Sequence, residues 1–321
     1  MCRNSDRNGR CFRCAILDIG SNTVKLNVYE APSPAKPPFS ATTLLSQSQT
    51  VGLINYIANG VLSDVGIARL CETVSAYAAL ARDLLCKEII CVATASLRFI
   101  SNGAAVLSSV ERQSGCKIRI LSGEEEAALS FEAVMASTDA PCETGYVIDM
   151  GGGSTEIVGF SDGHPQEKVS LPFGCLSLHN RFISSVLPTR RELHEASSFI
   201  DEQLGKVAWL GSFGDTAFLV GGTARAAGKL HCEICRRRLV NDYRMPADQF
   251  QMLYRKYASP GRKRIQTMIR VIPDRIHTVI PGLCAYTRIF EATGVRNTVI
   301  SFAGVRDGMI LRRIKEEAHL D

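Results

Sequence analysis

The chain has 321 residues, which is long enough for two domains that each bury a core of their own. Hydrophobic residues make up 45% of the chain and charged residues 21%, a composition that excludes a largely disordered protein. The formal net charge of +5, from 37 basic and 32 acidic residues, favours an anionic partner only weakly.

The cellular compartment is predicted from the polar start and the cysteine usage. The opening run MCRNSDRNGR has no apolar signal segment, and no run of the chain reaches the roughly 18 apolar residues of a membrane span. We therefore expect a cytoplasmic protein with no membrane partner, and most of its twelve cysteines as buried thiols. Two CxxC pairs, Cys11 with Cys14 and Cys232 with Cys235, could hold zinc, although such sites usually take both pairs from one small module.

Two β-hairpins of the same design are predicted. The first, CAILDIGSNTVKLNVYEA, is an apolar strand that ends at Asp18, turns through a polar tip and resumes as a second strand. The second, GYVIDMGGGSTEIVGFSDG, follows about 131 residues later, with Asp149 before a turn of three glycines and Glu156 after it. This repetition indicates an internal duplication.

Helices and strands alternate after each hairpin. The first half predicts a helix over 64–85, the strand EIICVAT, a helix near 104–114 and the strand KIRILS. The second half predicts helices over 189–209, 247–257 and 280–293, the strand AFLVGGTA entering a glycine turn, the strand TVISFAG and a terminal helix over 305–318.

The boundary between the halves is predicted in the segment STDAPCETG, because Pro, Asp and Gly interrupt two apolar stretches there. We expect one domain over 1–139 and a second over 140–321, each with one hairpin loop. The terminal helix over 305–318 belongs to the second domain by sequence order, but it could pack back on the first domain.

The hairpin tips have the composition of phosphate-binding loops. Backbone N–H groups of a Gly/Ser/Thr turn can surround phosphate oxygens, while an Asp at the strand end holds a divalent ion through water. One such loop alone is equally well explained as a turn capped by Asp, but two with matched flanks favour phosphate binding.

A third feature is LSGEEEAALSFEAV, in which three glutamates open a helix. Carboxylates in a first turn are often there to stabilise the helix dipole. A carboxylate near Glu156 could instead take a proton from water during phosphoryl transfer.

These segments resemble the exopolyphosphatase and guanosine pentaphosphate phosphohydrolase (Ppx/GppA) family of the actin-like ATPase superfamily. The resemblance rests on DIGSNTVKLNV, ATASLRFISNG, LSGEEEAALSF, VIDMGGGSTEIV, SLPFGCLSLHNRF, VGGTARAAG and SFAGVRDGMI, in the family's order. It implies an α/β fold of two actin-like (RNase H-like) domains, with mixed β-sheets flanked by helices and the active site in the cleft between them. It also implies Mg²⁺ as cofactor and hydrolysis of a terminal phosphoanhydride.

The resemblance assigns roles to individual residues. The catalytic group is Glu126 as general base, Glu156 as second carboxylate and Arg98 as the transition-state charge. The metal side takes Asp18 and Asp149. The phosphate-binding residues are Gly20, Ser21, Asn22, Lys25, Thr94, Asn102, Gly151, Gly152, Gly153, Ser154 and Thr155, with Lys25 where the family often has Arg or His.

The chain also departs from the family's pattern. Ala128 stands where Arg is common, and His277 stands where an acidic residue is usual, beside Arg275 in its expected place. The chain resembles the short, two-domain form of the family, because it ends where longer members continue. None of these departures removes the proposed base.

The predicted substrate is inorganic polyphosphate, and guanosine pentaphosphate is the alternative. Basic residues in the second half could guide a polyanion, whereas a nucleic-acid partner is not expected because no aromatic stacking platform accompanies them. These basic residues are Arg236, Arg237, Arg238, Arg255, Lys256, Arg262, Lys263 and Arg264. A small-molecule kinase, a non-catalytic polyphosphate or alarmone sensor, and assembly as a homodimer stay open.

Overall fold

The computed structural model describes residues 10–33, 40–139, 142–259 and 261–319. They divide into two compact units, one built from residues up to Ser122 together with those from Arg306 onward, and one from Gly123 to Val305. This division differs from the boundary expected at residue 139 by helix α4 (Gly123–Ser137), which groups with the second unit. The terminal helix α11 (Val305–His319) groups with the first unit.

The first unit is built on a five-stranded mixed sheet of order β3-β2-β1-β6-β7. Strand β1 is antiparallel to β2 and parallel to β6. The strands are β1 (Arg10–Ile19), β2 (Thr23–Ser33), β3 (Thr42–Thr50), β6 (Glu88–Ala93) and β7 (Ile118–Ile120), with a small β4 (Ile57–Ala58) and β5 (Val61–Leu62) pair. The helices are η1 (Leu53–Tyr56), α1 (Asp64–Asp83), α2 (Ala95–Arg98), α3 (Gly103–Ser114) and the terminal α11.

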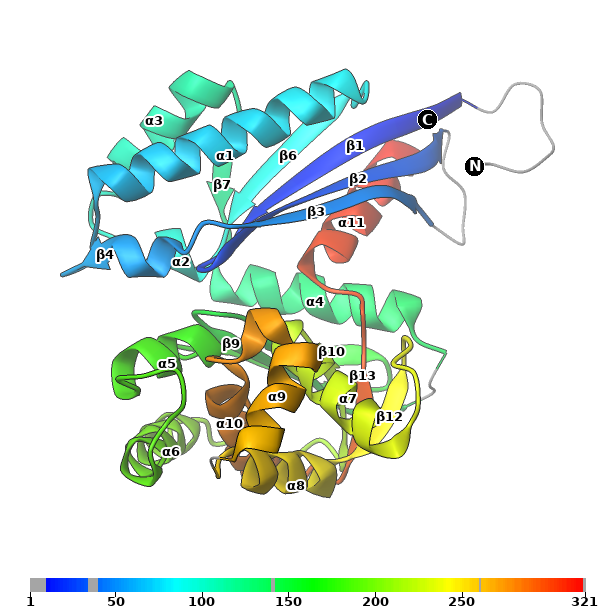
Figure 1. Cartoon of the computed structure of the whole chain (residues 1–321). Coiled ribbons are helices and arrows are strands. Elements are labelled where there is room, and N and C mark those ends of the chain that lie inside the picture. Colours follow the sequence, from blue (N-terminus) through cyan, green and yellow to red (C-terminus); the bar gives the residue numbers. More distant parts are fainter. Residues whose placement is uncertain (1–9, 34–39, 140–141, 260, 320–321) are drawn as a thin grey trace. The chain divides into compact units, whose positions relative to one another are not determined.

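Alternation along β1 and β2 gives this sheet two covered faces. Leu17 and Leu26 belong to the apolar cluster that also contains Leu70 of α1 and Val106 of α3. Residues of the opposite parity, such as Tyr29, face α11, whose Asp307 accepts a 3.0 Å hydrogen bond from the Tyr29 hydroxyl. Helices α1 and α3 therefore lie on one face of the sheet and α11 on the other (Figure 1).

The second unit contains a six-stranded mixed sheet of order β10-β9-β8-β11-β13-β12. Its strands are β8 (Thr144–Met150), β9 (Thr155–Ser161), β10 (His164–Leu171), β11 (Thr216–Val220), β12 (Tyr243–Pro246) and β13 (Asn297–Ile300). Its helices, besides α4, are α5 (Cys175–Phe182), α6 (Arg190–Leu204), α7 (Gly222–Cys235), α8 (Ala247–Tyr257), α9 (Arg262–Val271), η2 (Pro273–Arg275) and α10 (Val279–Thr293).

Two apolar clusters hold this second sheet. On one face Ile148 and Ile157 pack with residues of α5 to α10, where Phe250, Tyr286 and Phe290 form close ring contacts. On the other face Val147 and Phe160 pack against α4 through residues that include Phe131. Helix α4 is thus the cover of one face of this sheet, which explains why it groups with the second unit.

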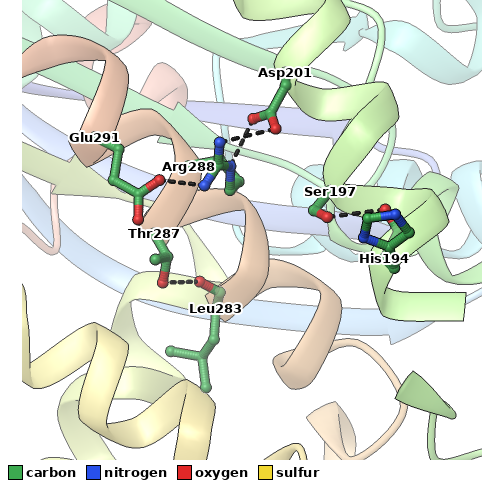
Figure 2. Close-up of polar contacts among 7 residues, drawn as sticks. All are labelled: His194, Ser197, Asp201, Leu283, Thr287, Arg288 and Glu291. Atoms are coloured by element: carbon green, nitrogen blue, oxygen red, sulfur yellow. Dashed lines mark hydrogen bonds and ion pairs between the residues drawn. The ribbon is translucent and has the colours of Figure 1, made fainter. Parts of the chain in front are cut away.

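An ion-pair network ties α6 to α10 at the surface of this unit (Figure 2). The Arg288 guanidinium donates to both carboxylate oxygens of Asp201, at 2.6 and 2.8 Å, and also to Glu291 one turn further along α10. The planar guanidinium suits this paired geometry, so that it adds a polar link between the two helices.

Candidate functional site

The two predicted hairpin loops are structurally equivalent. In each, the amide of the first loop residue donates to the carbonyl three residues on, Gly20 to Thr23 and Gly151 to Ser154, both at 3.0 Å. The strands that flank the loops pair in the same register, since Asp18 faces Lys25 and Asp149 faces Glu156. The repeat seen in the sequence is therefore a repeat of backbone geometry.

The loop of the second unit is held from behind by the start of α5. The Gly151 carbonyl accepts from the Cys175 amide at 3.1 Å, and the Gly152 carbonyl accepts from the amides of Leu176 and Ser177 at 3.0 and 2.9 Å. A Cβ on Gly174 would lie 2.6 Å from the Gly151 carbonyl oxygen, so only glycine permits this approach. Oxygen atoms that would repel a phosphate are thereby bound within the protein.

The loop of the first unit is held in the same way by the segment that follows β3. The Asn22 carbonyl accepts from the amides of Val51 and Gly52 at 2.9 and 2.8 Å, and the Ser21 carbonyl accepts from Ile54 at 3.0 Å. The sequence offered no signal for this support, because it depends on a segment some thirty residues away. In both loops, carbonyl groups are thus bonded within the protein, an arrangement compatible with phosphate binding by other backbone amides of the loop.

Two carboxylates lie side by side at the end of the β8–β9 hairpin. Asp149 and Glu156 are register partners, so their side chains point to the same face of the sheet, the face covered by α4. Ser130 of α4 donates to Asp149 Oδ2 at 2.5 Å, and Ser170 of β10 donates to Glu156 Oε1 at 2.7 Å. Glu156 is only 1% exposed, and a buried carboxylate needs such donors.

Glu126 belongs to the same group. It lies one helical turn before Ser130 on α4 and is 8% exposed, so it faces the sheet rather than the solvent. Glu124 in the same first turn is exposed. The structure therefore separates the three predicted glutamates, and it gathers Glu126, Asp149 and Glu156 within one unit.

The N-terminus of α7 is a further part of this site that the sequence did not reveal. A Cβ on Gly221, whose φ is +103°, would lie 2.5 Å from the Met150 carbonyl oxygen and 3.3 Å from Asp149 Oδ1. The positive end of the helix dipole therefore lies beside Asp149 and Met150, where the glycine loop begins. Arg275 lies over this helix start, because a Cβ on Gly222 would be 2.3 Å from its Nη2 atom.

In the first unit, Asp18 is surrounded by cations. Its register partner is Lys25, and Arg306 Nε of α11 lies 3.8 Å from Asp18 Oδ2. Arg306 also donates to Asn27 Oδ1 at 2.7 Å, which fixes the guanidinium against the sheet. Lys25 occupies the place that Glu156 holds in the second hairpin, so the two half-sites differ in charge at equivalent positions.

The three residues predicted after β6 have different surroundings. Thr94 stands at the N-cap position of α2 without a capping bond from its side chain, and its amide donates to the Ile19 carbonyl at 3.2 Å, which places it beside the first loop. Arg98 Nε donates to the Leu121 carbonyl at 3.0 Å. The Asn102 side chain donates to the Leu62 carbonyl at 2.8 Å and accepts from the Leu62 amide at 3.0 Å. These bonds give Asn102 a structural task in addition to any contact with phosphate.

The carboxylates are suited to an ion that keeps most of its water. No group of three or more His, Cys, Asp or Glu side chains within the described ranges is arranged to hold a metal by itself. Mg²⁺ usually binds one or two carboxylates and takes its other ligands from water and substrate phosphate. Asp149, oriented by Ser130 beside the loop, fits that requirement.

The two CxxC pairs are poorly suited to binding one zinc ion together. Burial raises the pKa of the Cys14 thiol to about 12, which opposes the thiolate that zinc needs. Cys11 and Cys14 lie on β1 of the first unit, whereas Cys232 and Cys235 lie on α7 of the second. Cys235 Sγ is 3.5 Å from His231 Nε2, within a local network that includes the Tyr243 hydroxyl.

Among the described helices none is both long and apolar enough to cross a membrane.

Comparison with known proteins gives consistent results. The sequence model of the Ppx/GppA phosphatase family matches residues 35–317. Exopolyphosphatase 1 of Mycobacterium tuberculosis and that of Mycobacterium leprae are each 26% identical to the chain over 96% of its length, covering 90% and 91% of their own.

Solved structures resemble the chain over nearly its whole length. The crystal structure of the Aquifex aeolicus member of the Ppx/GppA family is similar with a TM-score of 0.79 at 24% identity, over 97% of this chain and 100% of that one. An exopolyphosphatase from Cytophaga hutchinsonii is similar with a TM-score of 0.83 at 17% identity, over 95% and 98%. The predicted α/β class, with two mixed sheets flanked by helices in an actin-like fold, is confirmed.

Proposed function

Because the chain belongs to the Ppx/GppA phosphatase family, we propose that it is an exopolyphosphatase, a phosphoanhydride hydrolase that releases terminal phosphate from inorganic polyphosphate. The observation that carries this proposal is the group formed by Glu126, Asp149 and Glu156 at a glycine loop whose carbonyl groups are already bound. Carboxylates beside a phosphate loop suit water as the acceptor, because a water must be oriented and deprotonated.

Each residue of the group has a proposed task. Glu126 accepts a proton from the attacking water, and Glu156, held by Ser170, orients that water. Amides of the Gly151–Thr155 loop and the N-terminus of α7 bind the phosphate oxygens. Arg98 and Arg275 are the proposed charges for the transition state.

We propose Mg²⁺ as the cofactor, with Asp18 and Asp149 as the metal-side carboxylates of the two units. When bound, the ion neutralises phosphate charge that would otherwise be repelled by the glutamates. The Ser130 hydrogen bond leaves Asp149 in one orientation, which suits a ligand that acts through water.

Polyphosphate is favoured over guanosine pentaphosphate because the aromatic residues of the basic segment 236–264 offer little surface on which a guanine ring could stack. Tyr243, Phe250 and Tyr257 are buried in the core of the second unit. Tyr254 is partly withdrawn from solvent as well, and this burial raises the pKa of its hydroxyl. A guanine ring needs a face to stack on or a set of hydrogen bonds, whereas a phosphate chain needs only distributed positive charge. Arg262 and Lys263 at the start of α9 are exposed and supply such charge.

The test is to measure kcat/KM side by side on long polyphosphate, short polyphosphate and guanosine pentaphosphate. We expect the highest value for polyphosphate, and an apparent affinity that falls with added salt while kcat changes little. The double variant R262A/K263A should raise KM for long chains more than for short ones. A higher kcat/KM for guanosine pentaphosphate would replace this proposal with the alternative substrate, and binding without turnover would indicate a sensor.

A further inference from the structure

A hollow of about 610 Å³ lies at the C-terminal ends of α7 and α9. Its size is within the range of small-molecule sites, roughly 300–1,000 Å³. Its lining is strongly basic and includes Lys229, Glu233, Arg236, Arg237, Arg238 and Arg270.

The positive charge of this hollow is largely uncompensated by its own lining. Of the described residues that line it, Glu233 is the one carboxylate, and it is paired with Arg270 through bonds of 2.6 and 3.3 Å. That pair fixes the ends of the two helices against each other. Lys229 and three consecutive exposed arginines then place four further cations around this one open hollow.

Helix capping accounts for only part of this arrangement. Cations near the end of a helix are favoured by its dipole, but this effect is small for each cation and falls off within one turn. Arg236 also ends α7 in the left-handed region, with φ at 55°, where glycine is the usual residue. A non-glycine residue in that conformation is strained, and such strain is often found at ligand sites.

This hollow is distinct from the phosphate-loop site of the same unit. Helix α7 begins at Gly222, beside Asp149, and ends at Cys235. Its 14 residues span about 21 Å at 1.5 Å per residue, so the two sites lie at opposite ends of one helix.

We propose that the hollow is a second anion site, which binds a chain of linked phosphates outside the catalytic group. Several adjacent cations match an anion whose charges are spaced along a chain. Binding of such an anion reduces the repulsion between the neighbouring arginine and lysine side chains. No aromatic ring is found among the described lining residues, which favours a phosphate chain without a nucleobase. The phosphates come either from a distant part of the substrate polymer or from a separate short chain.

The experiment measures binding of inorganic tripolyphosphate to the full-length chain by calorimetry, with a chelator present so that turnover does not interfere. The double variant R237A/R238A should weaken one binding event at least tenfold. The matched control K168A/R190A, which removes two exposed cations elsewhere on the unit, should leave that event unchanged. The charge-retaining variant R237K/R238K should keep most of the affinity.

Circular dichroism of each variant shows that a lost binding event is not lost folding. Equal affinity in R237A/R238A and the intact chain, or equal weakening in the control, would overturn the proposal. This experiment measures binding and not hydrolysis. If the chain binds tripolyphosphate through this hollow but hydrolyses no substrate, the proposed function is contradicted and the second anion site is not.

Hydrolysis assays then identify the source of the phosphates. If the hollow binds the distant part of the substrate, R237A/R238A raises KM for long polyphosphate and leaves KM for tripolyphosphate unchanged. If it binds a separate chain, added tripolyphosphate changes the rate of long-polyphosphate hydrolysis in two ways in the intact protein: by competition at the catalytic group and by binding in the hollow. The second effect should be absent in R237A/R238A.

Discussion

At the scale of single residues, the site depends on partners that orient its carboxylates. Asp149 accepts from Ser130 and Glu156 accepts from Ser170, two serines that come from α4 and β10. A carboxylate so held has fewer orientations to lose when it binds a hydrated ion or a water molecule. These serines are therefore positioning residues for the proposed reaction.

Replacing Ser130 with alanine should lower kcat about 10- to 100-fold and raise the Mg²⁺ concentration needed for half-maximal rate, because Asp149 loses its orienting donor. The control is Ser137→Ala on the same helix, whose hydroxyl is exposed and bonds only to the Val134 carbonyl one turn earlier in the described contacts. An unchanged Mg²⁺ dependence in Ser130→Ala would contradict a positioning role, even if the rate fell.

The positions of residues marked by a local sequence pattern could be predicted, whereas the positions of residues brought in by tertiary contact could not. Asp18, Asp149 and Glu156 stand at strand ends next to glycine turns, a pattern visible in the sequence. Arg306 and Arg275 reach the two half-sites from segments distant in the chain. Both stand in segments that resemble the family, but the sequence assigned neither of them a role in the site.

At the scale of elements, the periodicity of apolar residues predicted the hairpin strands and several long helices, but it did not predict helix α7. The predicted helix over 64–85 corresponds to α1, and the two hairpins pair in the register that their alternation indicates. For the region of α7 the sequence predicts only a glycine turn at its start, because Gly221 and Gly222 resemble loop residues. They are required instead by the close approach of Met150 and Arg275.

The start of α6 offers a test of local structure through pH. Glu192 accepts hydrogen bonds from the Thr189 and Ser184 amides and from both hydroxyls, which lowers its pKa to about 2. A lowered pKa in the folded state stabilises the protein above the ordinary carboxyl pKa, and this contribution is lost as the pH falls from about 4.5 towards 2.

Glu192→Gln should therefore lower the urea midpoint at pH 7, and the difference from the intact chain should shrink at pH 3. The control is Glu195→Gln, an exposed residue of the same helix. A difference that is constant between pH 7 and pH 3, or that grows at low pH, would show that the carboxylate is not the stabilising form.

At the scale of the whole molecule, sequence order and three-dimensional grouping differ in the placement of two helices. Helix α4 precedes the predicted boundary but covers the β8–β9–β10 face of the second unit, and α11 ends the chain but belongs to the first. Composition marked the Pro-containing segment after α4 as the boundary. It could not show that α4 packs with the strands that follow it, because that choice depends on apolar contacts such as Phe131 with Phe160.

Removal of divalent ions tests the proposed cofactor in the intact molecule. Excess chelator should abolish phosphate release, and added Mg²⁺ should restore it, because unshielded phosphates would be repelled by Asp149, Glu126 and Glu156. Full activity in chelator would show that the loops and arginines alone neutralise the substrate.

The central claim is that Glu126 acts as the base for hydrolysis of polyphosphate. The most direct measurement is orthophosphate release from polyphosphate by the intact chain, by Glu126→Gln and by the matched control Glu124→Gln, together with polyphosphate binding by each. We predict that Glu126→Gln lowers kcat by about 10²- to 10⁴-fold with binding nearly intact, since the amide cannot accept the proton, and that Glu124→Gln has near-normal kcat because Glu124 is exposed. Near-normal turnover in Glu126→Gln, or an equal loss in Glu124→Gln, would contradict the account.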